Sequence, residues 1–146
     1  MIDSLKFLVC PECKSQLRKS TSLELQCSKC ENKYEIKDEI PILLPLDLEE
    51  FKVLEAEYHD HEAHHYGEIN MIDSYHVTYY NEKYLNIVNT LEKNSILLEV
   101  GSGDGNDANR INNSEIIVIQ SDISFEMVKL AKSNKKINSK TIYVVS

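Results

Sequence analysis

The spacing of hydrophobic positions changes twice along the chain and divides it into three segments. Residues 1–46 contain short stretches of alternating apolar and polar residues, such as 23–26 and 34–36, and a two-residue period predicts strands. Residues 47–95 place apolar side chains at steps of three and four, which predicts helix. Residues 96–146 consist of short apolar runs separated by polar turns. These periods predict a small β module, a helical connector and an α/β segment.

The helical connector has one apolar face, which ends where Asn94 and Ser95 break the pattern. This face is predicted to comprise Val77, Tyr80, Tyr84, Ile87, Val88 and Leu91. Before the connector, Pro41 and Pro45 exclude helix and favour extended chain, because proline lacks the backbone N–H that a helix needs.

The third segment alternates strand and helix. Strands are predicted over 96–100, 116–119 and 141–145, with a short helix near 107–111 between the first two. A second helix is predicted to run to about Lys132, with Ser124 as its N-cap. A β-α-β-α-β series predicts an α/β fold with a parallel sheet and right-handed crossovers.

Charge is distributed unevenly and argues against some partners. The formal net charge is −8, and residues 47–95 hold eleven acidic side chains against three lysines. Such a segment repels a phosphate backbone, so nucleic acid is not favoured as a partner, although a solvated helical face is the simpler explanation of the charge. No apolar run approaches the ~20 residues of a membrane span, and the N-terminus lacks signal-peptide character, so we expect a cytoplasmic protein without a membrane partner.

The four cysteines form two C-x-x-C pairs within the first thirty residues. Cys10 and Cys13 are separated from Cys27 and Cys30 by thirteen residues. In a reducing compartment this spacing predicts a structural zinc site with four thiolate ligands, and a closed tetrahedral shell leaves no position for a catalytic water. The alternatives are a redox-active dithiol or, in a secreted protein, two disulfides. A metal would stabilise a module too small to bury an adequate core.

The residues around the cysteines resemble a zinc-ribbon family that serves as the activator subunit of tRNA and release-factor methyltransferases and is also fused ahead of other methyltransferases. The resemblance covers most of residues 5–45 and rests on 8–13, Leu17, 23–30, Tyr34, Ile36 and 40–44. It implies a zinc-ribbon domain over 1–46 and a methyltransferase as partner. One departure is Glu39, where the family usually has glycine before Ile-Pro.

Three of the chain's four glycines follow the strand predicted over 96–100, at Gly101, Gly103 and Gly105. A strand that runs into a glycine turn and then a helix is typical of nucleotide-cofactor sites in α/β folds. Residues 103–108 also satisfy the weak G-x-G-x-x-A dinucleotide pattern. However, Asp104 and Asp107 would repel a pyrophosphate, whereas an acidic loop suits the sulfonium and ammonium groups of S-adenosylmethionine.

Residues 99–105 and 119–127 resemble the first two motifs of class I S-adenosylmethionine-dependent methyltransferases. The resemblance implies that residues 96–146 are the N-terminal half of a Rossmann-like methyltransferase domain. It also implies a cofactor site in which the glycines and Ser102 line the amino-acid portion and Glu99 attracts the ammonium group. In this site Asp122 accepts hydrogen bonds from the ribose hydroxyls and Ile123 packs near the adenine. The alternative role for Asp122 is that of a helix-capping acid.

The acidic connector over 47–95 contains a histidine-rich stretch at residues 59–65. His61 and His65 share a helical face, which permits a metal site, although a solvated polar helix is the favoured interpretation. In related methyltransferases this region caps the cofactor with aromatic side chains. The candidates here are Tyr58, Tyr66, Tyr75 and Tyr79.

The chain ends at Ser146, on the third predicted strand, whereas the methyltransferase family continues with further strands that hold the acceptor site. We therefore predict no catalytic residue and expect this chain alone to be inactive. The first hypothesis is a partial methyltransferase that keeps the cofactor loop. The alternative is a non-catalytic zinc-ribbon adaptor that binds and stabilises a partner methyltransferase. In either case strand 96–100 has an unpaired edge, where a second copy or another protein can pair.

Overall fold

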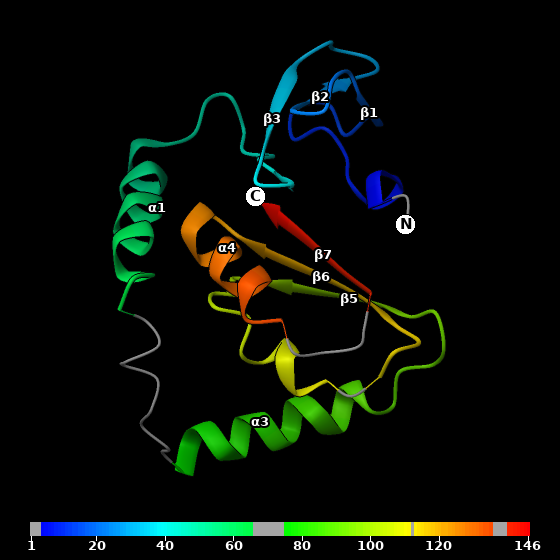
Figure 1. The fold of residues 1–146 in the computed structure, drawn as a ribbon, viewed down its shortest axis with the longest axis vertical. Coiled ribbons are helices and arrows are strands. Elements are labelled where there is room, and N and C mark those ends of the chain that lie inside the picture. The colour runs from blue at the N-terminus through cyan, green and yellow to red at the C-terminus, as the bar shows by residue number, and fades with distance from the viewer. Residues whose placement is uncertain (1–3, 66–74, 112, 136–139) are drawn as a thin grey trace.

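The N-terminal part of the chain forms a four-stranded antiparallel sheet. The structure, a computed structural model, describes residues 4–65, 75–111, 113–135 and 140–146. A short 3-10 helix, η1 (Ser4–Phe7), precedes strands that pair in sequence order (Figure 1). These strands are β1 (Leu17–Lys19), β2 (Glu24–Cys27), β3 (Lys33–Lys37) and β4 (Ile40–Pro41). The alternating pattern predicted the second and third strands, and both are confirmed to within two residues at each end.

The C-terminal part forms a three-stranded parallel sheet of β5 (Ile96–Val100), β6 (Ile117–Asp122) and β7 (Lys140–Val145), in that order. The predicted parallel pairing is confirmed. Helix α4 (Phe125–Ser133) connects β6 to β7, and the predicted N-cap is also confirmed, because the Ser124 hydroxyl accepts a hydrogen bond from the Met127 N–H at 3.1 Å. Between β5 and β6 the structure has only a three-residue 3-10 helix, η2 (Ala108–Arg110), where a short helix was predicted.

The described part of the acidic connector contains two helices. Helix α1 (Glu50–Glu62) has no buried side chain, whereas α3 (Tyr75–Val88) covers one face of the parallel sheet through Val88. Tyr84 and Leu91 of the predicted apolar face also pack there, but Ile87 is exposed. The side chains of Val77 and Tyr80 lie outside the described part of the structure.

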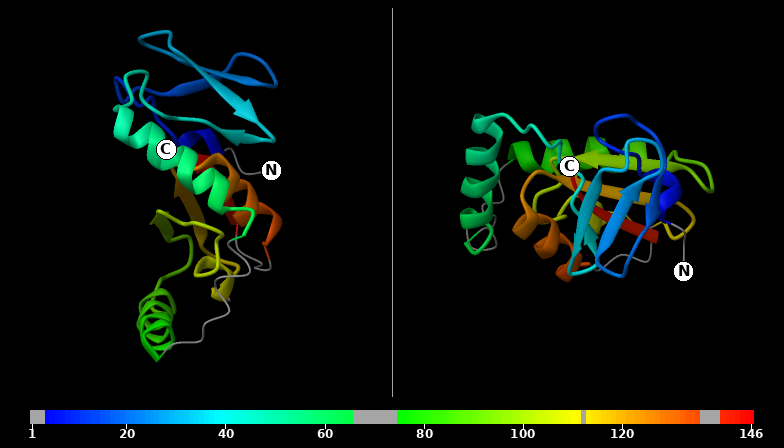
Figure 2. Two further views of the ribbon diagram at one scale, coloured as in Figure 1. Left: turned by 90° about the vertical axis from the view of Figure 1, so that its left-hand side faces the viewer. Right: turned by 90° about the horizontal axis from the view of Figure 1, so that it is seen from above.

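The two sheets are joined through the segment that follows β4. Ile42 forms a parallel bridge with Val145, and the Leu43 N–H donates to the Val145 carbonyl at 2.7 Å. The antiparallel module therefore lies over the parallel sheet, as Figure 2 shows from above. One core is common to both parts and contains Leu8, Cys10, Leu17, Leu25, Cys27, Tyr34, Leu43, Ile119, Ile142 and Val144.

The module covers β6 and β7 and leaves the neighbouring strand uncovered. Neighbouring residues of parallel strands project to the same face, so Leu98 lies beside Ile119, with which it is paired in register. Ile119 is buried under the antiparallel module, but Leu98 is 58% exposed. Ile96 and Val100 on the same face of β5 are also more than half exposed. Among the described strands, β5 pairs on one side only, with β6.

The β3–β4 hairpin turn gives a testable consequence of the departure at Glu39. Asp38 and Glu39 both have left-handed backbones, with φ of +49° and +63°, and such turns favour glycine. Glu39 also forms an exposed ion pair with Lys132 at 2.8 Å, and exposed pairs of this kind contribute little to stability. We expect Glu39→Gly to raise the free energy of unfolding by roughly 0.5–1 kcal/mol, because the relief of left-handed strain exceeds the contribution of the lost ion pair.

Urea unfolding measures this effect, and Glu39→Gln is the matched control. Glutamine keeps the side chain and the backbone strain but removes the charge that pairs with Lys132. We expect Glu39→Gln to be slightly destabilising and Glu39→Gly to be stabilising. Equal destabilisation by both substitutions would contradict a strained turn.

Candidate metal centre and glycine-loop cavity

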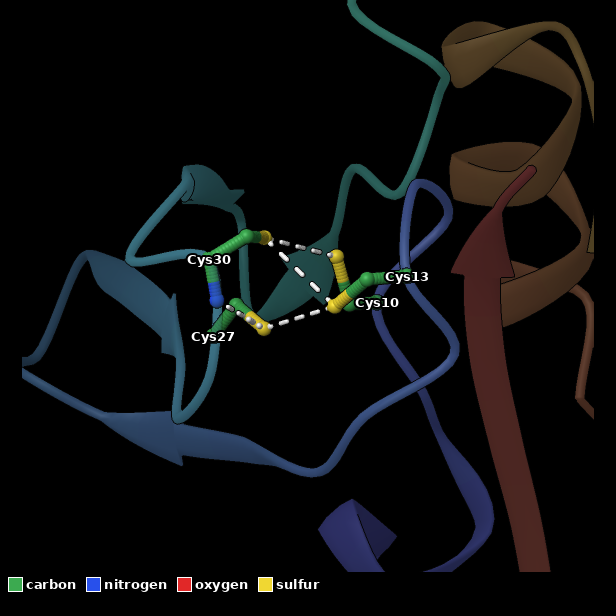
Figure 3. Close-up of side chains that lie close together, drawn as sticks. All are labelled: Cys10, Cys13, Cys27 and Cys30. Atoms are coloured by element: carbon green, nitrogen blue, oxygen red, sulfur yellow. Dashed lines mark hydrogen bonds between the residues drawn. The ribbon is translucent and has the colours of Figure 1, made fainter.

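The four cysteine side chains converge on one point between the turn that precedes β1 and the turn that follows β2 (Figure 3). Their sulfur atoms all lie within 4.8 Å of one another. The Sγ atoms of Cys13 and Cys27 are 3.4 Å apart, and Cys30 lies 3.6 Å from both Cys10 and Cys13. A tetrahedral zinc ion with bonds of about 2.3 Å sets sulfur separations of about 3.8 Å, so this donor set fits zinc.

The two C-x-x-C turns share one backbone conformation. The residue after each pair, Lys14 or Glu31, has a left-handed backbone, with φ of +59° and +63°. The N–H of the first cysteine in each pair donates to the carbonyl five residues ahead, from Cys10 to Ser15 and from Cys27 to Asn32, both at 2.9 Å. These matched turns present both cysteine pairs toward the same point.

The pKa values within the sulfur cluster differ, being lowered for Cys10 and Cys13 and raised for Cys30. Hydrogen bonds from Ser15 lower the pKa of Cys13 to about 6. A backbone hydrogen bond from Asn32 favours ionisation of Cys30, but burial and the three neighbouring cysteines together raise its pKa to about 12. The cluster therefore does not hold four thiolates by itself, and a bound cation is what allows all four to ionise.

Tyr34 supports the cluster from β3. Its side chain is buried in the common core, and its hydroxyl lies 3.1 Å from the Cys10 sulfur. Burial raises the pKa of Tyr34, so the hydroxyl stays protonated and donates to the thiolate. Such a hydrogen bond orients a metal ligand. Sequence reasoning assigned Tyr34 only to a strand and missed this contact.

This antiparallel module with four converging cysteines is a zinc ribbon. Residues 3–39 match the family model described as Trm112p-like protein, so the zinc ribbon is Trm112p-like. The matched residues do not include the glycine loop. No curated protein matches the chain. In the described part of the chain, no helix has the length and apolar character needed to cross a membrane.

The glycine loop borders a cavity of about 500 Å³. Four of the residues predicted to bind the cofactor line it, namely Gly101, Gly103, Asp122 and Ile123. The parallel register explains this convergence, because β5 and β6 end side by side and their following loops meet at that edge. The cavity is also lined by the segment after β4, by α1 and by Met127 of α4.

Three other residues predicted for the cofactor site do not line the cavity. Glu99 accepts a hydrogen bond from the Gln120 amide at 3.1 Å, and burial raises its pKa. Ser102 is buried, and its hydroxyl has no hydrogen-bond partner among the described residues. Gly105 packs against Ala131 of α4. The role of these residues in cofactor binding stays a prediction.

Asp122 organises the loops at the edge of the sheet. Its carboxylate accepts hydrogen bonds from the Gly103 N–H at 2.9 Å and from the Ser124 N–H at 3.0 Å. The first bond fixes the glycine loop, and the second fixes the start of α4. Asp122 therefore has a structural role that accounts for its position without a ligand, while its carboxylate also borders the cavity.

Helix α1 contributes one wall of the cavity. Lys52, Glu55 and His59 lie at helical spacing on the side that faces the cavity. The Asp60 carboxylate accepts hydrogen bonds from the Ser124 hydroxyl at 2.5 Å and from the Glu126 N–H at 3.0 Å. A carboxylate at a helix N-terminus is favourable, so Asp60 anchors α1 to the start of α4.

The histidine-rich stretch contributes one residue to the cavity. Only His59 of this stretch lines it, while the rings of His61 and His65 lie 6.4 Å apart, centre to centre, outside the cavity. In the described part of the chain, the four cysteines are the only group of three or more such side chains close enough to share a metal.

The aromatic residues expected to cap the cofactor do not line the cavity where they are described. Tyr58 is exposed and contacts the His59 ring edge-on, and Tyr79 is also exposed. Tyr66 and the Tyr75 side chain lie outside the described part of the structure.

Sequence reasoning missed Lys52 and Asp60, because nothing in the local pattern shows which side of α1 faces the sheet.

Proposed function

We propose that this chain is a non-catalytic adaptor that binds and stabilises a partner methyltransferase. The observation that carries the proposal is the Trm112p-like zinc ribbon with its four converging cysteines. Proteins of this family activate methyltransferases by binding them. In this proposal the parallel sheet enlarges the surface that the ribbon offers to the partner.

The uncovered strand is the surface that best fits such a partner. One face of the ribbon is already buried against β6 and β7 of the same chain. The exposed apolar side chains of Ile96, Leu98 and Val100 continue that interface onto β5. Among the described strands β5 pairs only with β6, and an edge strand of this kind pairs with a strand of another protein.

Leu98→Lys tests this surface. The side chain is already exposed, so we expect the stability of the isolated chain to change by less than about 0.5 kcal/mol. In a partner complex the added charge would be buried without a counter-ion, and we expect binding to weaken about a hundredfold. The measurement is co-expression with class I methyltransferases of the source genome, followed by gel filtration and titration of the purified complex.

Leu54→Lys is the matched control, because Leu54 lies on α1 and is exposed to the same extent, 58%. This control should bind the partner as the unmodified chain does. Equal binding by the Leu98→Lys variant would place the interface elsewhere. A chain that stays monomeric with every methyltransferase tested would contradict the adaptor function itself.

A second candidate function is binding of S-adenosylmethionine. The observation that favours it is the convergence of Gly101, Gly103, Asp122 and Ile123 on one cavity of about 500 Å³, a size typical of small-molecule sites. In this second proposal Asp122, which borders the cavity, accepts hydrogen bonds from the ribose hydroxyls. Calorimetric titration with S-adenosylhomocysteine tests this function, and absence of heat at millimolar ligand would contradict it.

A further inference from the structure

Helix α1 borders the cavity although none of its side chains is buried. A thirteen-residue helix of this kind is marginally stable alone, so its contacts with the rest of the chain decide where it lies. The Asp60 carboxylate accepts two hydrogen bonds from the start of α4, and Ala63, one residue beyond the helix, is buried. Figure 1 shows α1 beside α4, and Lys52, Glu55 and His59 of this helix line the cavity.

The cavity-lining side chains of α1 include two opposite charges. Lys52 and Glu55 are three residues apart on the helix and both line the cavity. Within the described residues, no ion pair joins them to each other or to another side chain. The exposed residues elsewhere on α1 are mixed in character and include the apolar Phe51 and Leu54 as well as Glu57. Lys52 and Glu55 are the charged residues of α1 that line the cavity.

We propose that α1 is a ligand-binding wall that recognises an amino-acid zwitterion through Lys52 and Glu55. This inference rests on the second candidate function, in which the cavity binds S-adenosylmethionine. The ammonium of Lys52 pairs with the ligand's carboxylate, and the carboxylate of Glu55 pairs with its ammonium group. Asp60 is a positioning residue, because it fixes the helix without facing the ligand.

The charges of the cavity also disfavour a phosphate ligand. Lys52, Glu55 and Asp122 all line the cavity, so its described lining holds one basic and two acidic side chains. A nucleoside diphosphate would bring two or more negative charges to this surface. A ligand with one carboxylate and one ammonium group adds no net charge and matches both signs.

The test compares three probes by calorimetry on the full zinc-loaded chain. S-adenosylhomocysteine carries the zwitterion, adenosine lacks it, and adenosine diphosphate replaces it with phosphates. We expect Lys52→Gln and Glu55→Gln each to weaken S-adenosylhomocysteine about tenfold while adenosine binding changes less than about twofold. Glu57→Gln, on an exposed position of α1 that does not line the cavity, is the matched control and should bind both as the unmodified chain does.

Each outcome separates the two proposals. If the unmodified chain binds neither S-adenosylhomocysteine nor adenosine, the cofactor function fails and the ligand wall fails with it. If both bind but Lys52→Gln and Glu55→Gln affect them equally or not at all, only the assignment to α1 is overturned. A preference for adenosine diphosphate over S-adenosylhomocysteine would also overturn it. Unchanged thermal melting of the variants shows that folding is intact.

Discussion

Replacing both buried zinc ligands, Cys10→Ser with Cys27→Ser, is expected to unfold the whole chain and not the ribbon alone. Structural zinc contributes about 10–16 kcal/mol of binding free energy in small modules, which matches or exceeds the 5–15 kcal/mol that stabilises a typical domain. The ribbon and the parallel sheet share one core, in which Leu25 and Ile142 are both members. Loss of the ribbon therefore exposes the face of β6 and β7 to water.

Elemental analysis and circular dichroism measure this result. The unmodified chain should contain one zinc ion, lose both ribbon and sheet signals in one transition when a strong chelator is added, and recover them when zinc is restored. Ser28→Ala, in the second C-x-x-C turn but not a ligand, should keep its zinc. A folded, metal-free chain with unchanged melting would contradict the zinc site. Two separate transitions would contradict the shared core.

Gly105→Ala is expected to destabilise the chain by about 3 kcal/mol. Gly105 has a φ of +75°, a left-handed conformation that costs other residues about 1–2 kcal/mol. A Cβ atom there would lie 2.9 Å from the Ala131 Cβ and 3.2 Å from the Ala131 Cα, so the backbone of α4 would have to move. Overpacking of this kind adds about 1–3 kcal/mol.

Gly101→Ala separates the cost of left-handed strain from the cost of overpacking. Gly101 has a similar φ of +68°, but a Cβ atom there would meet nothing within 4 Å. We expect Gly101→Ala to lower the free energy of unfolding by the strain alone, about 1–2 kcal/mol. Urea unfolding measures both glycine variants. Equal losses for the two variants would mean that close packing of the loop on α4 does not contribute.

The parts of the site that were predictable from sequence depend on neighbouring residues. The C-x-x-C spacing is set by the two turns themselves, and the Ser124 cap needs only the next three residues. The glycine loop was located because left-handed backbone, as at Gly101, Gly103 and Gly105, favours glycine. The helix expected near 107–111 is reduced to a single turn of η2, and Ile87 lies outside the apolar face to which the period assigned it.

The sequence by itself determined the candidate metal ligands, the strand periods and the position of the cofactor-like loop, because each depends on residues that are a few positions apart in the chain. Only the tertiary structure decided that the ribbon lies on β6 and β7, that β5 stays uncovered and that Lys52, Glu55 and His59 of α1 line the cavity. The contact that anchors α1 joins Asp60 to Ser124 across 64 residues of chain. Local propensity carries no information about such pairs, because they form only when distant surfaces pack together.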